Sequence, residues 1–174
     1  MFLLLVVKKI YVFDRIRAAK HRPRLGTAII RIFPTDEAVR ASYPMLDHGD
    51  YFDYNLEYVF DDISPIDYTS EEIKERKLVL FSETNAERII TDFRQVMQAL
   101  DYLVVHCDLG RRRSPAVAAA LNHMFRLGIA DKDYLEFIHD PDWRPNMHVY
   151  RTLIEVARGR FNLKFNAYLL GEKD

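Results

Sequence analysis

One short stretch, residues 102–115, constrains most strongly what this chain can fold into. Residues 102–105 are aromatic or apolar and include two adjacent valines, which predicts a buried β-strand. The only cysteine, Cys107, follows in a glycine- and arginine-containing loop. An alanine-rich run with apolar residues at helical spacing comes next, and Pro115 suits its first position because proline lacks only an N–H that the helix does not use there. The pattern predicts a strand, a tight loop and a helix.

Such an arrangement directs several backbone N–H groups, and the positive end of a helix dipole, at one spot beside Cys107. An oxyanion held there would also meet arginine, whose planar guanidinium matches phosphate in two places. Cysteines in such surroundings have pKa values lowered to roughly 3.5–7.5, and the thiolate is the nucleophilic form. The stretch therefore predicts a nucleophile inside an anion-binding cradle. The alternative is a buried structural cysteine beside a basic surface loop.

Length and composition indicate a single domain over residues 1–174, with a core at about 10–158 and an appendage at 159–174. The 49% hydrophobic and 29% charged residues are typical of a globular protein.

The charge and the cysteine count exclude several kinds of function. A formal net charge of -1 argues against general nucleic-acid binding. The apolar stretch before Lys8 and Lys9 is too short to predict a membrane span. A single cysteine excludes an internal disulfide and a cysteine-rich zinc site, so we expect no metal and no cofactor. A free thiol suits the reducing cytoplasm.

Strand and helix patterns alternate along the chain, which predicts an α/β fold with a mostly parallel central sheet and helices on both faces. Besides the strand at 102–105, the patterns predict strands at residues 10–13, 27–33 and 56–60, and residues 78–81 are predicted to form either one more strand or an extended approach. Helices are predicted from the Asp14 cap to residue 20, at 36–42, 69–76, from a Thr84 or Asn85 cap to 100, and at 116–127, 131–139 and 148–158. Asp61 and Asp62 fall just past a strand end, where open α/β sheets place their chemistry.

The residues His106, Cys107, Arg113 and Ser114 form a His-Cys-x5-Arg-Ser sequence. It resembles the active-site loop of the cysteine-dependent protein tyrosine and dual-specificity phosphatases. Residues 59–63 and 144–150 resemble the acid-bearing strand end and the closing Pro-Asn segment of small bacterial tyrosine-phosphatase-like proteins. The likeness spans residues 10–158. It implies the phosphatase fold, with the phosphate-binding loop between a strand and a helix.

The resemblance implies a two-step reaction, in which the cysteine attacks phosphorus and water then hydrolyses the phosphocysteine. Cys107 would be the nucleophile, Arg113 would bind the phosphoryl oxygens, Ser114 would donate to the sulfur, and His106 would support the loop. The remaining loop residues, Asp108, Leu109, Gly110, Arg111 and Arg112, would surround the phosphate, with Asp108 shaping the loop. Asn146 and Asp61 would have supporting roles.

Three carboxyl groups are candidates for the general acid of this reaction: Asp62, Asp61 and Glu83. We favour Asp62, because the second aspartate of the Asp-Asp-Ile pattern should project from its loop, and Asp61 then serves as a turn or cap residue. Arg112 departs from the family pattern, where a small residue is common. Its bulk would narrow the site, while its charge would favour a multiply anionic substrate.

The expected substrate is a phosphorylated protein or a small phosphomonoester, and phosphate or sulfate should bind the loop. Two other functions remain open. A rhodanese-like sulfurtransferase would use residues 107–112 as a six-residue Cys-x2-Gly-x-Arg loop, but it needs no carboxylic acid. A catalytically inactive phosphate-binding module would keep the cradle without turnover. A nucleic-acid phosphatase is disfavoured because no second basic stripe accompanies residues 111–113.

Overall fold

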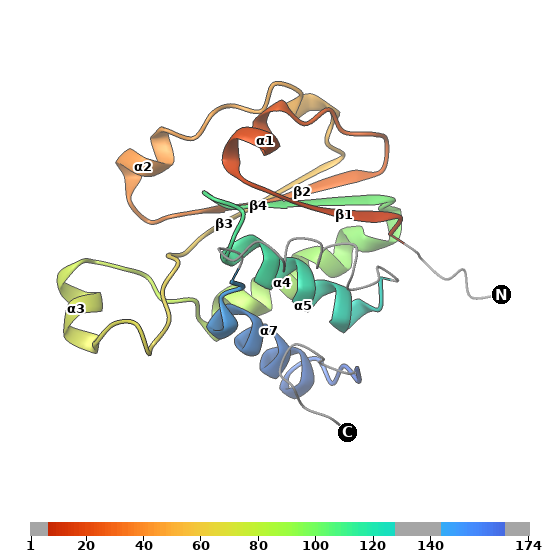
Figure 1. The fold of residues 1–174 in the computed structure, drawn as a ribbon. Coiled ribbons are helices and arrows are strands. Elements are labelled where there is room, and N and C mark those ends of the chain that lie inside the picture. The colour runs from red at the N-terminus through yellow and green to blue at the C-terminus, as the bar shows by residue number, and fades with distance from the viewer. Residues whose placement is uncertain (1–6, 128–143, 166–174) are drawn as a thin grey trace.

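A computed structural model describes residues 7–127 and 144–165 of the chain. Its centre is a four-stranded sheet in which all neighbouring strands are parallel, in the order β1-β4-β2-β3 (Figure 1). The strands are β1 (Lys9–Phe13), β2 (Thr27–Phe33), β3 (Tyr54–Val59) and β4 (Tyr102–His106). The last strand in sequence, β4, therefore lies between β1 and β2. Cys107 leaves the sheet from one of its two central strands.

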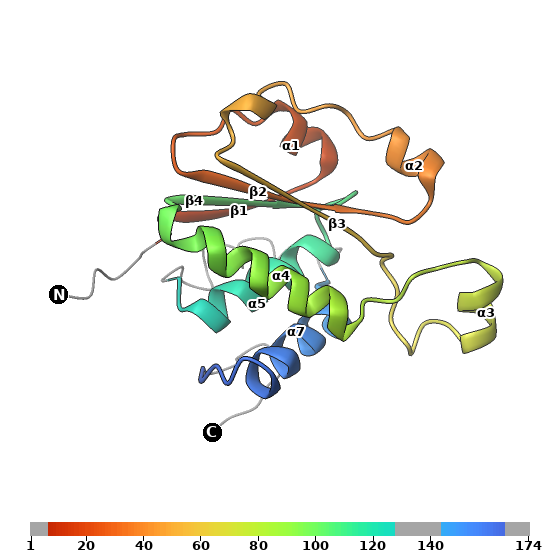
Figure 2. The ribbon, with the colours of Figure 1, turned by 180° about the vertical axis from the view of Figure 1, so that it is seen from behind.

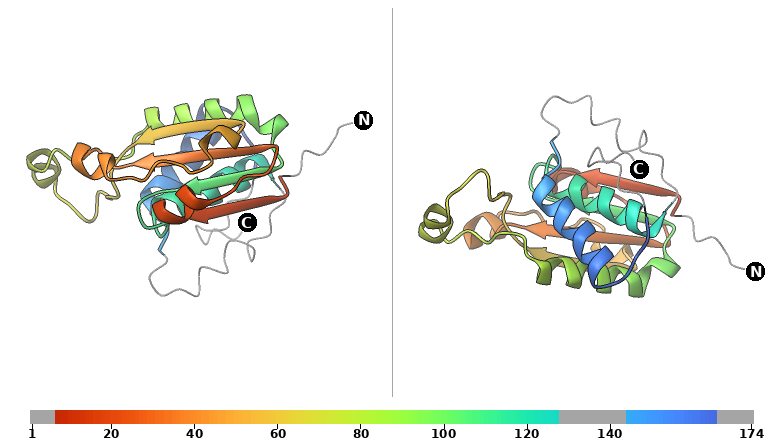
Figure 3. Two further views of the ribbon diagram at one scale, coloured as in Figure 1. Left: turned by 90° about the horizontal axis from the view of Figure 1, so that it is seen from above. Right: turned by 90° about the horizontal axis from the view of Figure 1, so that it is seen from below.

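Helices cover both faces of the sheet unequally (Figures 1 and 2). The longer ones, α4 (Glu83–Val96), α5 (Arg113–Phe125) and α7 (Met147–Gly159), lie on one face, and α7 packs against both α4 and α5. The opposite face carries α1 (Arg15–Lys20), α2 (Glu37–Ala41) and the short 3-10 helix η1 (Gly49–Tyr51). Helix α3 (Ser70–Glu75) stands away from the sheet beyond the ends of the strands (Figure 3).

The main hydrophobic core fills the space between the sheet and the three long helices. Helix α5 is buried from Arg113 to Met124, because the sheet covers one side and α4 and α7 cover the others. A smaller cluster around Ile29, Phe52 and Val104 lies apart from this core. Helix α5 is thus the most enclosed helix of the described chain, whereas residues 108–112 of the loop that precedes it are partly or fully exposed.

The predicted strands at 10–13, 27–33 and 102–105 are confirmed, and the third strand is two residues earlier than predicted at its start. Of the two alternatives for residues 78–81, the strand is excluded, because this segment joins none of the strands of the described sheet. Val79 instead exchanges hydrogen bonds with Asp61, whose backbone N–H donates to Val79 and whose carboxylate accepts from it. The two polar backbone groups of Val79 are therefore satisfied by a single residue, Asp61, and not by a neighbouring strand.

Two predicted helix starts also need correction. Helix α4 is capped by Ser82, not by Thr84 or Asn85; Ser82 and Asn85 form a reciprocal capping box, and the helix ends at Val96 before the 3-10 turn η2 (Met97–Ala99). Helix α5 begins at Arg113, so Pro115 is its third residue and not its first. The N–H of a third residue also has no partner within the helix, so proline is tolerated there. The predicted helix at 131–139 lies outside the described residues.

Candidate active site

The loop after β4 is held in a compact ring by backbone hydrogen bonds from other parts of the chain. Three of its carbonyl groups accept from distant N–H groups: Asp108 from Arg15 (3.1 Å), Arg111 from Arg144 (3.2 Å) and Arg112 from Asn146 (3.0 Å). The donors come from the start of α1 and from the segment that leads into α7. Both neighbouring segments therefore fix the path of the loop.

Gly110 makes the close approach to β1 possible. Its φ angle of +70° lies in the left-handed region, which side chains disfavour. A Cβ atom at this position would lie 2.7 Å from the backbone N of Asp14 and 2.7 Å from the carbonyl C of Phe13. Only glycine fits this turn without a shift of the β1–α1 junction.

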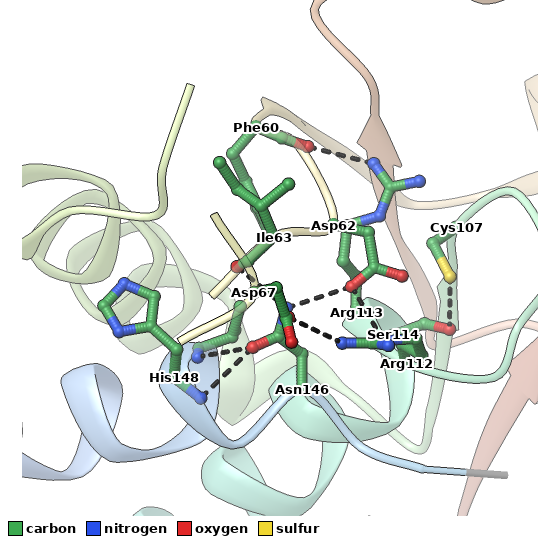
Figure 4. A network of polar contacts seen from close by, with 11 residues as sticks. Phe60, Asp62, Ile63, Asp67, Cys107, Arg112, Arg113, Ser114, Asn146 and His148 are labelled. Atoms are coloured by element: carbon green, nitrogen blue, oxygen red, sulfur yellow. Dashed lines mark hydrogen bonds and ion pairs between the residues drawn. The ribbon is translucent and has the colours of Figure 1, made fainter. Parts of the chain in front are cut away.

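Cys107 lies between the end of β4 and the first turn of α5. Its side chain is 3% exposed, and its Sγ lies 3.2 Å from the Oγ of Ser114, which is fully buried in α5 (Figure 4). The N-terminal turn of a helix carries N–H groups without partners and the positive end of the dipole. The sulfur therefore has a hydroxyl group within hydrogen-bonding distance and an electropositive helix end beside it.

Arg113 is the first residue of α5 and is 4% exposed. Its Nη1 donates to the carbonyl O of Phe60 at 2.9 Å, while its Nε makes no hydrogen bond to any described residue. A buried donor left without a partner costs about 1–3 kcal/mol. Such a donor is well suited to an anionic ligand.

A cavity of about 330 Å³ opens at this loop. The loop residues that we predicted to surround phosphate line this cavity, except Gly110. Leu109 is 65% exposed there. The side chain of Asp108 forms an ion pair with Arg15 (3.3 Å). The cavity is lined by Cys107, Asp108, Leu109, Arg111, Arg112, Arg113 and, from a different part of the sequence, Asp62.

The two adjacent aspartates after β3 have different surroundings. Asp61 is 6% exposed, and its carboxylate accepts from the backbone N–H of Thr35 (3.0 Å), from the Thr35 hydroxyl and from the N–H of Val79 (2.8 Å). Asp61 thus pins the chain after β3 to the chain after β2 and has the place of a turn residue. Asp62 is partly exposed and faces the cavity.

The carboxylate of Asp62 is held from two sides. Its Oδ1 accepts from the Nδ2 of Asn146 (3.0 Å) and lies 3.2 Å from the Nε of Arg112 (Figure 4). Asn146 is 1% exposed and caps α7 with its own Oδ1, which accepts from the N–H groups of His148 and Val149. Its amide also donates to the carbonyl O of Ile63. One buried asparagine therefore joins the start of α7 to the loop that carries Asp62.

The third carboxyl candidate, Glu83, lies elsewhere. It is the first residue of α4 and forms an ion pair with Arg160, at the C-terminal end of α7. It does not line the cavity that contains Cys107. Of the three carboxyl groups, only Asp62 does.

His106 is buried below the loop with both ring nitrogens occupied. Arg31 donates from its Nε to the His106 Nε2 (3.4 Å), which leaves the proton of a neutral ring on Nδ1, 3.5 Å from the carbonyl O of Cys107. Burial, together with the charge of Arg31, lowers the pKa of His106 to about 4. The neutral ring lies against the backbone of Cys107, and the supporting role inferred for His106 from the sequence stays a prediction.

Tyr43 is a neighbour of the loop that the sequence did not indicate. Its ring packs on Phe33 (5.1 Å between centroids) and on His106 (6.3 Å), and its hydroxyl is buried near Arg113 without a well-formed hydrogen bond. Burial raises the pKa of Tyr43 to about 12, so the phenol keeps its proton at neutral pH. No motif marks Tyr43, because it stands alone between a short helix and a loop.

Among the described residues, no cluster of histidine, cysteine or carboxylate side chains could hold a metal ion. Within the same residues, no helix has both the length and the apolar character needed to cross a membrane.

No known protein family matches the sequence, and no curated protein is significantly similar to it. Among solved structures, the chain is similar to human DUSP28, a dual-specificity phosphatase, with a TM-score of 0.54 and 15% sequence identity. The match covers 91% of this chain and 96% of that one. The chain has the dual-specificity phosphatase fold. This confirms the α/β fold, with its loop between strand and helix, that the sequence predicted.

A second similar structure is the human tyrosine phosphatase-like serine/threonine/tyrosine-interacting protein, with a TM-score of 0.41 and 19% identity over 78% of each chain.

Proposed function

We propose that this protein hydrolyses phosphomonoesters through a phosphocysteine intermediate, as a protein tyrosine or dual-specificity phosphatase. One observation carries the proposal: Cys107, at the N-terminal end of a buried helix, and Asp62, from the loop after β3, line the same cavity. A thiol and a carboxyl group are the nucleophile and the proton donor that this reaction needs.

In the first step, the Cys107 thiolate attacks phosphorus and forms an S–P bond. The P–O bond to the leaving group breaks, and the departing oxygen takes the proton of the Asp62 carboxyl group. Arg113 and the backbone N–H groups of the loop stabilise the charge that spreads over the three phosphoryl oxygens. The unpartnered Nε of Arg113 supports this role, because an anion would satisfy it.

In the second step, water attacks the phosphocysteine and the S–P bond breaks. The Asp62 carboxylate now accepts a proton from the water, so phosphate leaves and both groups return to their starting states. The Oγ of Ser114, 3.2 Å from Sγ, donates to the sulfur as negative charge returns to it. No metal and no cofactor takes part in either step.

The substrate in this proposal is a phosphorylated protein or a small phosphomonoester, and phosphate or sulfate binds the loop as product or product analogue. Attack on phosphorus by the thiolate requires that Cys107, the one cysteine in the sequence, stays reduced. We therefore place the activity in the cytoplasm.

One observation favours a second function, a phosphate-binding module without turnover. The Nη1 of Arg113 is already bound to the carbonyl O of Phe60, so the guanidinium is only partly available to a phosphoryl group. The sulfurtransferase alternative is less well supported. Its loop would end at Arg112, whose side chain pairs with Asp62 and Asp67.

Hydrolysis of p-nitrophenyl phosphate tests the proposal. The native protein should release nitrophenolate, and Cys107→Ser should remove this activity while inorganic phosphate still binds, as measured by calorimetry. Retained activity in Cys107→Ser would exclude the phosphocysteine mechanism. Phosphate binding without turnover in the native protein would favour the binding module, and thiocyanate formed from cyanide and thiosulfate would favour the sulfurtransferase.

A further inference from the structure

Arg112 occupies the loop position that commonly carries a small residue in the phosphatases that this loop resembles. Its side chain is turned toward two carboxylates. The Nε lies 3.2 Å from the Oδ1 of Asp62, and the Nη2 lies 3.6 Å from the Oδ2 of Asp67 (Figure 4). Both carboxylates belong to the loop that follows β3. One guanidinium thus spans two points of the segment that carries the proposed acid.

The backbone from which this side chain starts is itself fixed. The carbonyl O of Arg112 accepts from the N–H of Asn146 (3.0 Å) and from the N–H of Ala116 in α5 (3.3 Å). The amide of Asn146 then donates to the same Oδ1 of Asp62 that Arg112 contacts. The start of α5 therefore brings a charged guanidinium to this carboxylate oxygen, and the start of α7 brings a hydrogen-bond donor to it.

These two contacts also determine where a proton can sit on Asp62. Because Oδ1 accepts from the Asn146 amide and lies 3.2 Å from the positively charged Arg112 Nε, the protonated carboxyl group carries its hydrogen on Oδ2. Among the described residues, no hydrogen bond or ion pair engages Oδ2, and in Figure 4 it lies on the side of Asp62 that faces Cys107. The same anchoring serves the ionised form, whose free oxygen can accept a proton from water in the second step.

We propose that Arg112 is a positioning residue that, together with Asn146, holds the carboxyl group of Asp62 over the cavity with Oδ2 free for proton transfer. This inference rests on the proposed phosphatase function. Asp67 is the second anchor, since it keeps the guanidinium aligned along the loop. A lysine in place of Arg112 offers a single point charge and cannot span both carboxylates.

The ion pairs themselves add little to the stability of the fold. The side chains of Arg112, Asp62 and Asp67 are 43%, 31% and 45% exposed, and pairs of this kind contribute about 0–1 kcal/mol. Replacing Arg112 should therefore leave the protein folded and change the placement of Asp62. A displacement of about 1 Å in a catalytic group can cost roughly 10²-fold in rate.

The test compares two substrates that differ in leaving group, p-nitrophenyl phosphate and phenyl phosphate. A misplaced acid matters most for phenyl phosphate, because phenolate needs the proton more than nitrophenolate does. Arg112→Ala should lower kcat for phenyl phosphate about 10-fold or more, and for p-nitrophenyl phosphate less than about 3-fold. Asp67→Asn should show the same preference with a smaller loss. The inhibition constant of inorganic phosphate should stay within about 2-fold, since the Arg112 guanidinium pairs with Asp62 and Asp67 and only the backbone of this residue contributes to the phosphate-binding loop.

Three further variants complete the experiment. Arg112→Lys should recover only part of the activity on phenyl phosphate, and adding Arg112→Ala to Asp62→Asn should cause no further loss, because both changes remove the same contribution. Arg88→Ala is the matched control: Arg88 is an exposed arginine paired with Asp92 (3.7 Å) on α4, and its replacement should change the rate on neither substrate.

Equal losses on both substrates with weaker phosphate inhibition would mean that Arg112 binds the phosphoryl group, and would overturn the inference. So would an Arg112→Ala variant with native rates on both substrates. In either case the native protein still hydrolyses phosphate esters, and the proposed function stands. A native protein without any turnover would overturn both proposals together.

Discussion

Replacing Asp61 by asparagine should destabilise the fold, although the change is nearly isosteric. The two carboxylate oxygens divide their donors: Oδ1 accepts from the N–H of Thr35, and Oδ2 accepts from the Thr35 hydroxyl and from the N–H of Val79. An asparagine has only one acceptor oxygen. Whichever way its amide is turned, its NH2 group faces one of the two backbone N–H groups. The variant therefore loses a charge-assisted bond and leaves one donor unpaired.

The loss of such a bond, with one donor left unsatisfied, is worth about 1–3 kcal/mol. For a domain of this size, each kcal/mol shifts Tm by about 2–4 °C, so Asp61→Asn should melt roughly 2–12 °C below the native protein. Urea unfolding followed by circular dichroism measures the free energy directly. Asp62→Asn is the matched control and should unfold within about 0.5 kcal/mol of the native protein, since its contacts are partly exposed. A native-like stability of Asp61→Asn, or a larger loss in Asp62→Asn, would refute the assignment of these two aspartates.

Two more predictions concern the loop and the strand beneath it. Gly110→Ala should lower the unfolding free energy by about 2–4 kcal/mol, because the backbone there is left-handed and the new Cβ would lie 2.7 Å from atoms at the end of β1. Gly159→Ala is the control and should not destabilise the protein, since no atom lies within 4 Å of its new Cβ. Equal effects of the two changes would contradict this account. His106 has a folded-state pKa of about 4, below the usual 6.5, so the unfolded chain binds its proton first and stability falls as pH drops through this window. Between about pH 7 and pH 5 this effect should lower the unfolding free energy of the native protein by about 2 kcal/mol, but not that of His106→Gln. Urea unfolding of both proteins at the two pH values measures the difference, and an equal loss of stability in both would disprove the prediction.

The loop around Cys107 could be predicted from the sequence because its determinants are local. An apolar strand, a glycine that tolerates a left-handed turn and a helix with an apolar face all lie within residues 102–127. The caps of α1, α2 and α7 are equally local, since Asp14, Asp36 and Asn146 bond to N–H groups two and three residues ahead. Each of these features depends on neighbours in sequence and not on the tertiary fold.

Features that depend on distant partners could not be predicted in the same way. Residues 78–81 have the composition of a strand, and only the position of Asp61 decides that they bind a carboxylate instead of a sheet edge. Three residues near the start of α4 can cap a helix, and the reciprocal bonds between Ser82 and Asn85 select the first. Tyr43 reaches the loop because β2 and β4 are adjacent, which its own surroundings in sequence do not reveal.

The strand order explains why Asp62 needs such extensive anchoring. Because β2 lies between β3 and β4, the chain that leaves β3 must cross the end of β2 before it can reach the loop of Cys107. Asp61 secures the first part of this crossing by binding Thr35, just after β2, and Asn146 and Arg112 secure the part beyond it. A sequence fixes none of these contacts until the order of the strands is known. Once that order is known, the consequence of replacing Arg112 follows. With a residue that cannot reach both carboxylates, Asn146 is the one side chain among the described residues that still holds Asp62 near Cys107. We therefore expect the proton-transfer step to be sensitive to Arg112.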